Sequence, residues 1–63
     1  MQKMSLKAAR ANANLTQKDV AKELGVDVST VRNWECGRTF PKQPMIEKLC
    51  TLYGTSYDFI KFF

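Results

Sequence analysis

The stretch QKDVAKELGVDVSTVRNW, residues 17–34, decides the fold of this chain. Its apolar side chains recur at helical spacing on both sides of the tripeptide Gly25-Val26-Asp27. A link this short does not suit an ordinary antiparallel pair of helices, and the leading glycine allows a sharp change of direction. Ala21 is small where the next helix must cross closely, and Val31 is placed to fill the angle between the two helices. We therefore expect two short helices that meet at a steep angle, the helix-turn-helix geometry.

Capping residues and a proline divide the rest of the chain into further short helices. Residues suited to begin a helix are Ser5, Thr16, Asp27 and Ser56, with Pro44 as the first residue of another. The expected helices cover about residues 6–12, 17–24, 28–36, 44–53 and 57–63. We predict an all-α fold, a compact bundle of five short helices in a single domain, residues 1–63. The second and third helices form the helix-turn-helix.

The last expected helix is rich in aromatic side chains, with Tyr57, Phe59, Phe62 and Phe63 close together. Helical spacing predicts that Phe59, Ile60 and Phe63 pack inward. Some apolar surface remains after this packing, and an exposed aromatic patch usually marks an interface.

Composition excludes several classes of protein. Ten Lys and Arg against six Asp and Glu give this chain of 63 residues a net charge of +4, which favours an anionic partner such as nucleic acid. Without His, and with only Cys36 and Cys50 as thiols, the chain offers neither a proton shuttle nor a four-ligand zinc site. We expect no catalysis, no cofactor and no small-molecule ligand. No stretch suits a signal peptide or a membrane span, so we expect a cytoplasmic protein.

Several motifs extend over nearly the whole chain. One is Gln17-x-x-x-Ala21-x-x-x-Gly25-x-x-x-x-x-Val31, and the others are Asn14-Leu15-Thr16-Gln17, Trp34-Glu35-Cys36-Gly37-Arg38, and Ile46-x-x-Leu49-Cys50 with Gly54. Together they resemble the phage repressor and Cro class of helix-turn-helix proteins. The resemblance implies a Cro-like transcriptional repressor, encoded by a phage or its bacterial host, that binds a palindromic operator in double-stranded DNA as a homodimer.

The expected third helix presents a polar face opposite its core-facing Val31. At about 100° per residue, Ser29 and Asn33 lie nearly opposite that side chain. Asn can pair with adenine, Arg with guanine, and Val can touch a thymine methyl group. A merely solvated helix face is the alternative. We expect base contacts from Val28, Ser29, Arg32 and Asn33.

Phosphate contacts are expected on either side of this face. The backbone N–H groups at the start of the second helix favour an anion, and the loop after the third helix carries cations. The expected phosphate contacts are Thr16, Gln17, Thr30, Arg38, Thr39 and Lys42. The resemblance implies that Gln17 also braces the third helix. Lys18 can lie near DNA or in solvent, whereas ordinary solvated surface is expected for Lys3, Lys7, Lys48 and Lys61.

The resemblance implies two structural roles as well. Arg10 and Glu35 match a pair that forms a salt bridge in the family, with a phosphate contact from Arg10 as the alternative. The family dimerises on DNA near its C-terminal end, which sets the two third helices about 34 Å apart. The expected dimer interface consists of Pro44, Tyr57, Phe59 and Phe62.

Two other interpretations stay open. The chain can be a helix-turn-helix used as a protein-interaction module, an antitoxin or adaptor that grips a partner through its aromatic end. It can also be the DNA-binding fragment of a longer repressor. A membrane anchor is disfavoured, because Lys61 is the only cation in the aromatic C-terminal segment.

Overall fold

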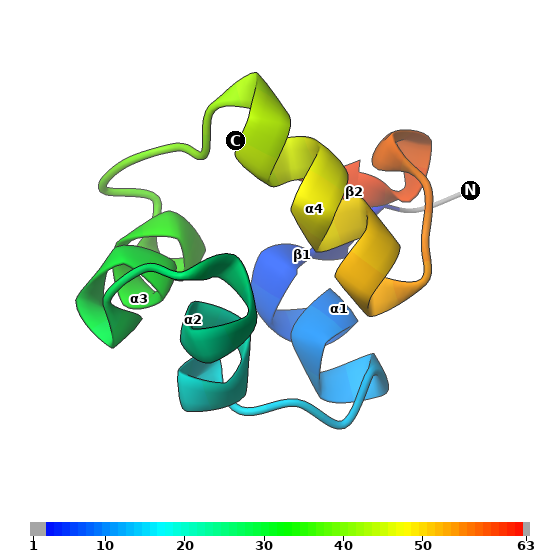
Figure 1. Cartoon of the computed structure of the whole chain (residues 1–63). Coiled ribbons are helices and arrows are strands. Elements are labelled where there is room, and N and C mark those ends of the chain that lie inside the picture. The colour runs from blue at the N-terminus through cyan, green and yellow to red at the C-terminus, as the bar shows by residue number, and fades with distance from the viewer. Residues whose placement is uncertain (1–2, 63) are drawn as a thin grey trace.

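Short helices dominate the computed structural model, which describes residues 3–62 (Figure 1). Its α-helices are α1 (Leu6–Asn12), α2 (Gln17–Leu24), α3 (Val28–Cys36) and α4 (Gln43–Tyr53). A 3₁₀ turn, η1 (Tyr57–Phe59), follows α4, and two short strands, β1 (Met4–Ser5) and β2 (Ile60–Lys61), lie near the chain ends. None of the helices within residues 3–62 is long and apolar enough to cross a membrane.

Local hydrogen bonds explain where the first three helices begin. The Ser5 hydroxyl accepts a backbone N–H in the first turn of α1. At α2, the Asp19 N–H donates to Thr16 Oγ1 over 3.1 Å, and the Thr16 N–H donates to Asp19 Oδ2 over 2.9 Å. This capping box lowers the pKa of Asp19, because hydrogen bonds from Thr16 favour the carboxylate. Asp27 Oδ1 accepts the Ser29 N–H over 3.1 Å and caps α3.

Gly25 ends α2 in the left-handed conformation and turns the chain toward α3. Its φ is 69°, a value that residues with a Cβ atom adopt only at a cost in free energy. The Val26 N–H then donates to the Ala21 carbonyl over 3.0 Å, which closes the end of the helix. The turn thus reaches the start of α3 within three residues.

One hydrophobic core lies between the helices and the strand pair. Its buried members are Leu6, Ala9, Val20, Ala21, Leu24, Val31, Trp34, Ile46, Leu49, Tyr53, Ile60 and Phe62. Val20 and Val31 are among the most deeply buried, at 0% and 1% exposed. They come from α2 and α3, so the packing of these two helices on each other lies at the centre of the fold.

The predicted fifth helix is wrong. Beyond the turn η1, Ile60 and Lys61 form β2, which runs parallel to β1 with Met4 opposite Ile60 and Ser5 opposite Lys61. Figure 1 shows this pair behind α4. In a strand, alternate side chains face the same side, so Ile60 and Phe62 both enter the core while Lys61 points outward.

One further expectation fails at the same end of the fold. Phe59, expected inside, is 39% exposed, because η1 and β2 replace the continuous helix from which its inward position was expected. The expected inward position of Phe63 lies outside the described residues. The fourth helix begins at Gln43, so Pro44 occupies its second position and not the expected first position. Proline still fits there, because the N–H groups of the first turn have no partner within the helix.

Replacement of Gly25 tests the turn between α2 and α3. No atom lies within 4 Å of a Cβ built there, so Gly25→Ala meets no steric obstacle and feels only the strain of a positive φ. We expect the free energy of unfolding to fall by about 1–2 kcal/mol. Urea denaturation measures the loss, with Lys22→Ala on the exposed side of α2 as the control. Equal stability of the two variants would contradict the left-handed turn.

Candidate nucleic-acid interface

The outward face of α3 carries polar side chains at helical spacing. Val31 and Trp34 hold the helix to the core, at 1% and 8% exposed. Ser29 and Arg32 are exposed on the other side, and Asn33 is half-buried beside them. The remaining two expected contacts on this helix, Val28 and Thr30, are also half-buried. With its core side buried, α3 therefore presents these donors and acceptors on its solvent side.

A network around Glu35 links this helix to two others. Arg10 donates from Nε to Glu35 Oε2 over 2.7 Å and from Nη2 to Oε1 over 3.3 Å. Gln17 Nε2 donates to the same Oε1 over 3.0 Å. Arg10 Nη1 also donates to the Leu15 carbonyl over 2.9 Å. This Glu35 network therefore joins α1, the turn before α2, the first residue of α2 and the end of α3.

The Glu35 network is largely removed from solvent. The side chains of Arg10 and Glu35 are only 15% and 5% exposed. The hydrogen bond to Glu35 raises the pKa of Arg10, and this effect outweighs the opposing effect of burial. The pKa of Tyr53 in α4 is shifted as well. Burial, and to a lesser extent the nearby negative charge of Glu35, raises this pKa to about 12. Arg10 is thus committed to the structure, and Tyr53 stays neutral beside it.

The start of α2 lies at the edge of this network. Thr16 is exposed, and its hydroxyl accepts the capping hydrogen bond while keeping its own proton to donate. Gln17 is half-buried, and its bond to Glu35 leaves its amide oxygen and one N–H available. Lys18 follows on the exposed side. This helix start therefore keeps donors that are free for an anion.

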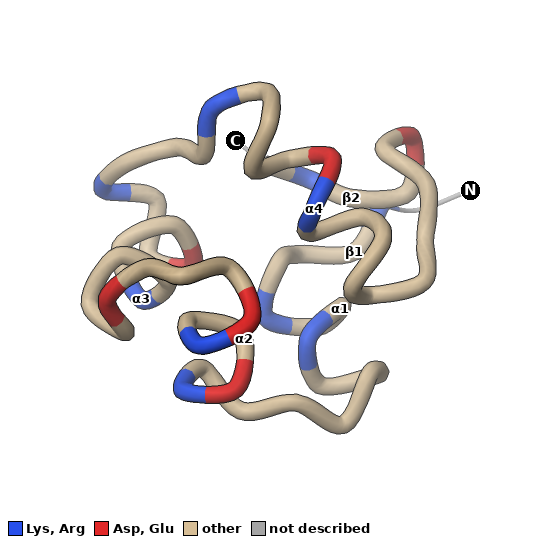
Figure 2. The backbone as a smooth tube through the Cα atoms, in the orientation of Figure 1, with Lys and Arg blue, Asp and Glu red and all other residues tan. Residues whose placement is uncertain are grey.

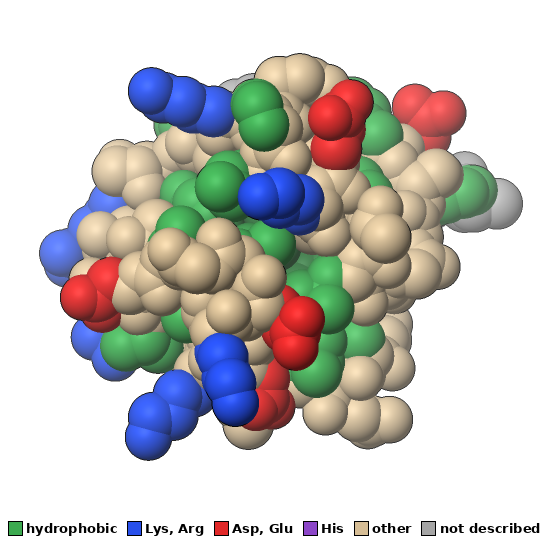
Figure 3. Space-filling model, viewed as in Figure 1, with side chains coloured by type: hydrophobic (Ala, Val, Ile, Leu, Met, Phe, Trp, Pro, Cys, Tyr) green, Lys and Arg blue, Asp and Glu red, His purple; other side chains and the backbone are tan. Residues whose placement is uncertain are grey.

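The loop between α3 and α4 adds cations to the same side of the molecule. Arg38, Thr39 and Lys42 are all exposed. The N–H groups of Arg38 and Thr39 donate to the Asn33 carbonyl over 3.0 and 3.4 Å, which holds the first part of the loop against the end of α3. Figure 2 shows Lys and Arg positions along this loop, and Figure 3 shows such side chains projecting from the side of the molecule where α3 and the loop lie.

These exposed cations have no acidic partners among the described residues. Within residues 3–62, the ion pair between Arg10 and Glu35 is the only one within 4 Å. An isolated cation keeps its full charge for an external anion, whereas an internal pair cancels most of its own field. The uncompensated positive charge near α3 therefore belongs to Arg32, Arg38 and Lys42.

The expected dimer residues do not all lie at the surface. Pro44 is exposed, and Tyr57 and Phe59 are 48% and 39% exposed. Phe62 is a core residue at 5% exposed, and its ring stacks on that of Tyr57 with 5.4 Å between centroids. The register of β2 turns Phe62 inward, so it cannot offer the surface expected of it. Instead, its ring packs against the exposed ring of Tyr57.

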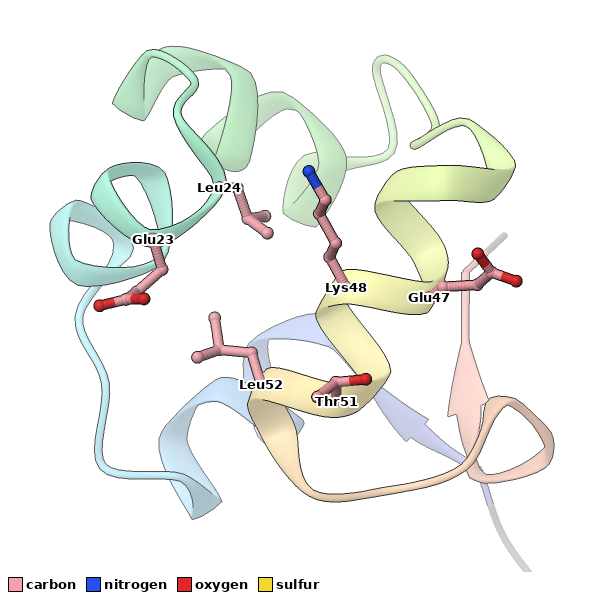
Figure 4. A pocket seen from close by; sticks show the side chains of 6 residues that line it. All are labelled: Glu23, Leu24, Glu47, Lys48, Thr51 and Leu52. Carbon is pink, nitrogen blue, oxygen red and sulfur yellow. The ribbon is translucent and has the colours of Figure 1, made fainter.

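Other surface features lie apart from α3. A groove of about 320 Å³ separates α2 from α4, with Leu24 and Leu52 pointing into it and Glu23 and Glu47 on opposite rims (Figure 4). No α3 residue lines this groove. In the described part of the chain, no three His, Cys, Asp or Glu side chains gather in a way that could hold a metal ion.

The sequence of this chain matches a known protein family. A family model described as helix-turn-helix matches residues 6–60, which is nearly the whole chain. The chain belongs to the Cro/C1-type helix-turn-helix family. A search of curated proteins and a search of solved structures gave no significant match. Membership of this family identifies the chain as a DNA-binding helix-turn-helix regulator.

Sequence reasoning found the residues of the Glu35 network only through this family's pattern. A bond between side chains at positions 10 and 35 leaves no local signal, because the two residues belong to different helices. The contact from Arg10 to the Leu15 carbonyl and the proximity of Tyr53 had no signal at all.

A double-mutant cycle tests how strongly the network holds the helices. Either Arg10→Ala or Glu35→Ala leaves partly buried polar groups without partners, so each should lower the free energy of unfolding by about 3 kcal/mol. The double variant should lose less than the sum, with a coupling of about 0.5–3 kcal/mol. Urea denaturation measures all three, and Lys48→Ala with Glu47→Ala on exposed α4 gives the matched cycle. Additive losses at positions 10 and 35 would contradict a shared network.

Proposed function

We propose that this chain is a transcription regulator, a Cro-like or phage-type repressor, that reads a palindromic operator in double-stranded DNA as a homodimer. In this proposal, residues 1–63 act as one domain in the cytoplasm, and α2 and α3 form the helix-turn-helix. The observation that carries the proposal is the outward face of α3. It combines side chains of types that can contact bases with neighbouring cations that have no acidic partner among residues 3–62.

Base recognition is assigned to the first two turns of α3. Arg32 can donate two hydrogen bonds to guanine, and Asn33 can pair with adenine. Ser29 can donate or accept, and Val28 can contact a thymine methyl group. Their exposure fits this division, because Ser29 and Arg32 project furthest while Val28 and Asn33 keep part of their surface against the protein.

Phosphate contacts are assigned to the two ends of this surface, from Thr16, Gln17, Thr30, Arg38, Thr39 and Lys42. Gln17 has a double role: one N–H braces Glu35, and the rest of its amide stays available for a phosphate. A phosphate that binds there is then coupled to the end of α3. Arg10 acts as a structural partner of Glu35, since three of its five N–H donors are engaged by Glu35 and the Leu15 carbonyl.

The homodimer is assigned to a surface away from α3, the aromatic patch formed by Pro44, Tyr57 and Phe59. Large exposed aromatic rings favour association. Two protomers on a palindrome would present their α3 helices about 34 Å apart, one turn of DNA. On this proposal, an operator with two half-sites should bind much more tightly than one half-site. Equal affinity for both, measured by titration of labelled duplexes, would remove the dimer from the proposal.

Selection from a randomised pool of double-stranded DNA at two salt concentrations tests DNA recognition. Retention of a short palindrome, with binding that weakens as salt rises, supports the proposal and gives the spacing of the half-sites. Retention without an enriched sequence would reduce the function to nonspecific binding. If no DNA is retained, a protein-interaction module, held through the aromatic patch, becomes the better interpretation.

Variants of the DNA surface should separate into two groups. Arg32→Ala or Asn33→Ala should weaken operator binding by about 1–3 kcal/mol and relax the preference at one base position. Arg38→Ala or Lys42→Ala should weaken all sequences alike and reduce the salt slope by about one unit for each bound protomer. Competition titrations against operator and mismatched duplexes measure both effects, with Lys22→Ala as the control. The division of the surface is wrong if the two groups behave alike.

A further inference from the structure

The strand pair brings two lysines from opposite ends of the chain to one place. Ser5 lies opposite Lys61, and both are exposed, whereas Ile60 faces the core. Lys3 comes two residues before Ser5, so the alternation of an extended chain places it on the same outward side. Lys3 and Lys61 line a common depression together with Tyr57, which confirms that the two lysines are neighbours. We refer to Lys3 and Lys61 as the strand lysines.

The strand lysines carry uncompensated charge. Neither takes part in an ion pair within 4 Å among residues 3–62, and no acidic residue lines the depression between them. Two like charges that line one depression repel each other, and an external anion would relieve this repulsion. A charged surface of this kind fits a polyanion.

The position of Lys61 connects this charge with the end of α3. Lys61 also lines a second depression, on which Cys36 and Gly37 of the α3 terminus lie. Glu35 lies there too, but its charge is already paired with Arg10. Arg38, an assigned phosphate contact, follows directly in the chain. Cations therefore lie on both sides of Gly37: Arg38 follows it in the chain, and Lys61 lies across the shared depression, with Lys3 next to Lys61.

We propose that the strand lysines extend the DNA-binding surface and contact backbone phosphates that flank the half-site read by α3. This inference rests on the proposed DNA-binding function and adds a contact region to it. Phosphate contacts of this kind add affinity and salt dependence without reading sequence. It replaces the expectation that Lys3 and Lys61 belong to ordinary solvated surface.

The test compares two variants of equal charge on two lengths of DNA. The strand variant is Lys3→Gln with Lys61→Gln, and the control is Lys22→Gln with Lys48→Gln on exposed positions of α2 and α4. One duplex extends about ten base pairs beyond each selected half-site, and the other ends at the half-sites. Binding is measured over a range of salt concentrations, and melting curves verify that both variants remain folded.

On the long duplex, the strand variant should lower the salt slope by about 0.9 for each lost phosphate contact. Two lysines in each protomer give roughly 1.8 units per bound protomer, and about twice that for a dimer on two half-sites. The control should lower the slope clearly less, and the base preference should not change. On the short duplex, the strand variant and the control should show the same slope. Equal slopes on the long duplex, or an equal loss on both duplexes, would overturn the flanking contact while DNA binding itself stands. If the wild-type chain selects no DNA, the proposed function fails, and this inference fails with it.

Discussion

Glu35 is the carboxylate on which the geometry of this small fold depends. Its two oxygens accept hydrogen bonds from Arg10 in α1 and from Gln17 at the start of α2, while the residue itself belongs to the last turn of α3. A helix of nine residues has little stability alone, so its direction must come from tertiary contacts. The apolar packing on the core side of α3 keeps the helix against the core, but it does not by itself prevent the helix from shifting along its neighbours. Directional hydrogen bonds at its end remove that freedom. The base reading proposed for α3 requires this, because base contacts tolerate little displacement.

The helix boundaries near this network could be predicted because their signals are local. Thr16 and Asp19 satisfy each other's backbone groups within a single turn, and Gly25 occupies the one conformation that favours glycine. Asp27 then caps α3 two residues later in the chain. Interactions over two or three residues leave their pattern in the sequence itself. Consequently, the beginnings and ends of α1, α2 and α3 follow from composition and spacing alone.

The C-terminal end shows where this reasoning stops. The segment Phe59 to Phe62 fits a helical spacing and an alternating one almost equally well, because four residues are too few to distinguish the two periods. The choice is made by Met4 and Ser5, which supply the strand that β2 pairs with. That partner lies at the other end of the chain, so no local pattern could reveal it. Once the strand forms, Phe62 must enter the core, and Phe59 is left outside.

The same distant pairing decides how the charge of the protein is arranged. Arg10 and Glu35 cancel each other, so the net charge of +4 resides entirely in side chains outside the Glu35 network. From the sequence, the cations of the loop after α3 could be proposed as DNA contacts because they directly follow the helix proposed to read bases. Lys61 could not, since only the strand pair brings it beside Gly37 and toward that same surface. The pairing of β1 with β2, which accompanies the burial of Ile60 and Phe62, thus also places a cation next to the end of α3. The burial of Ile60 and Phe62 on one side of β2 and the exposure of Lys61 on the other therefore both follow from the register in which β2 pairs with β1.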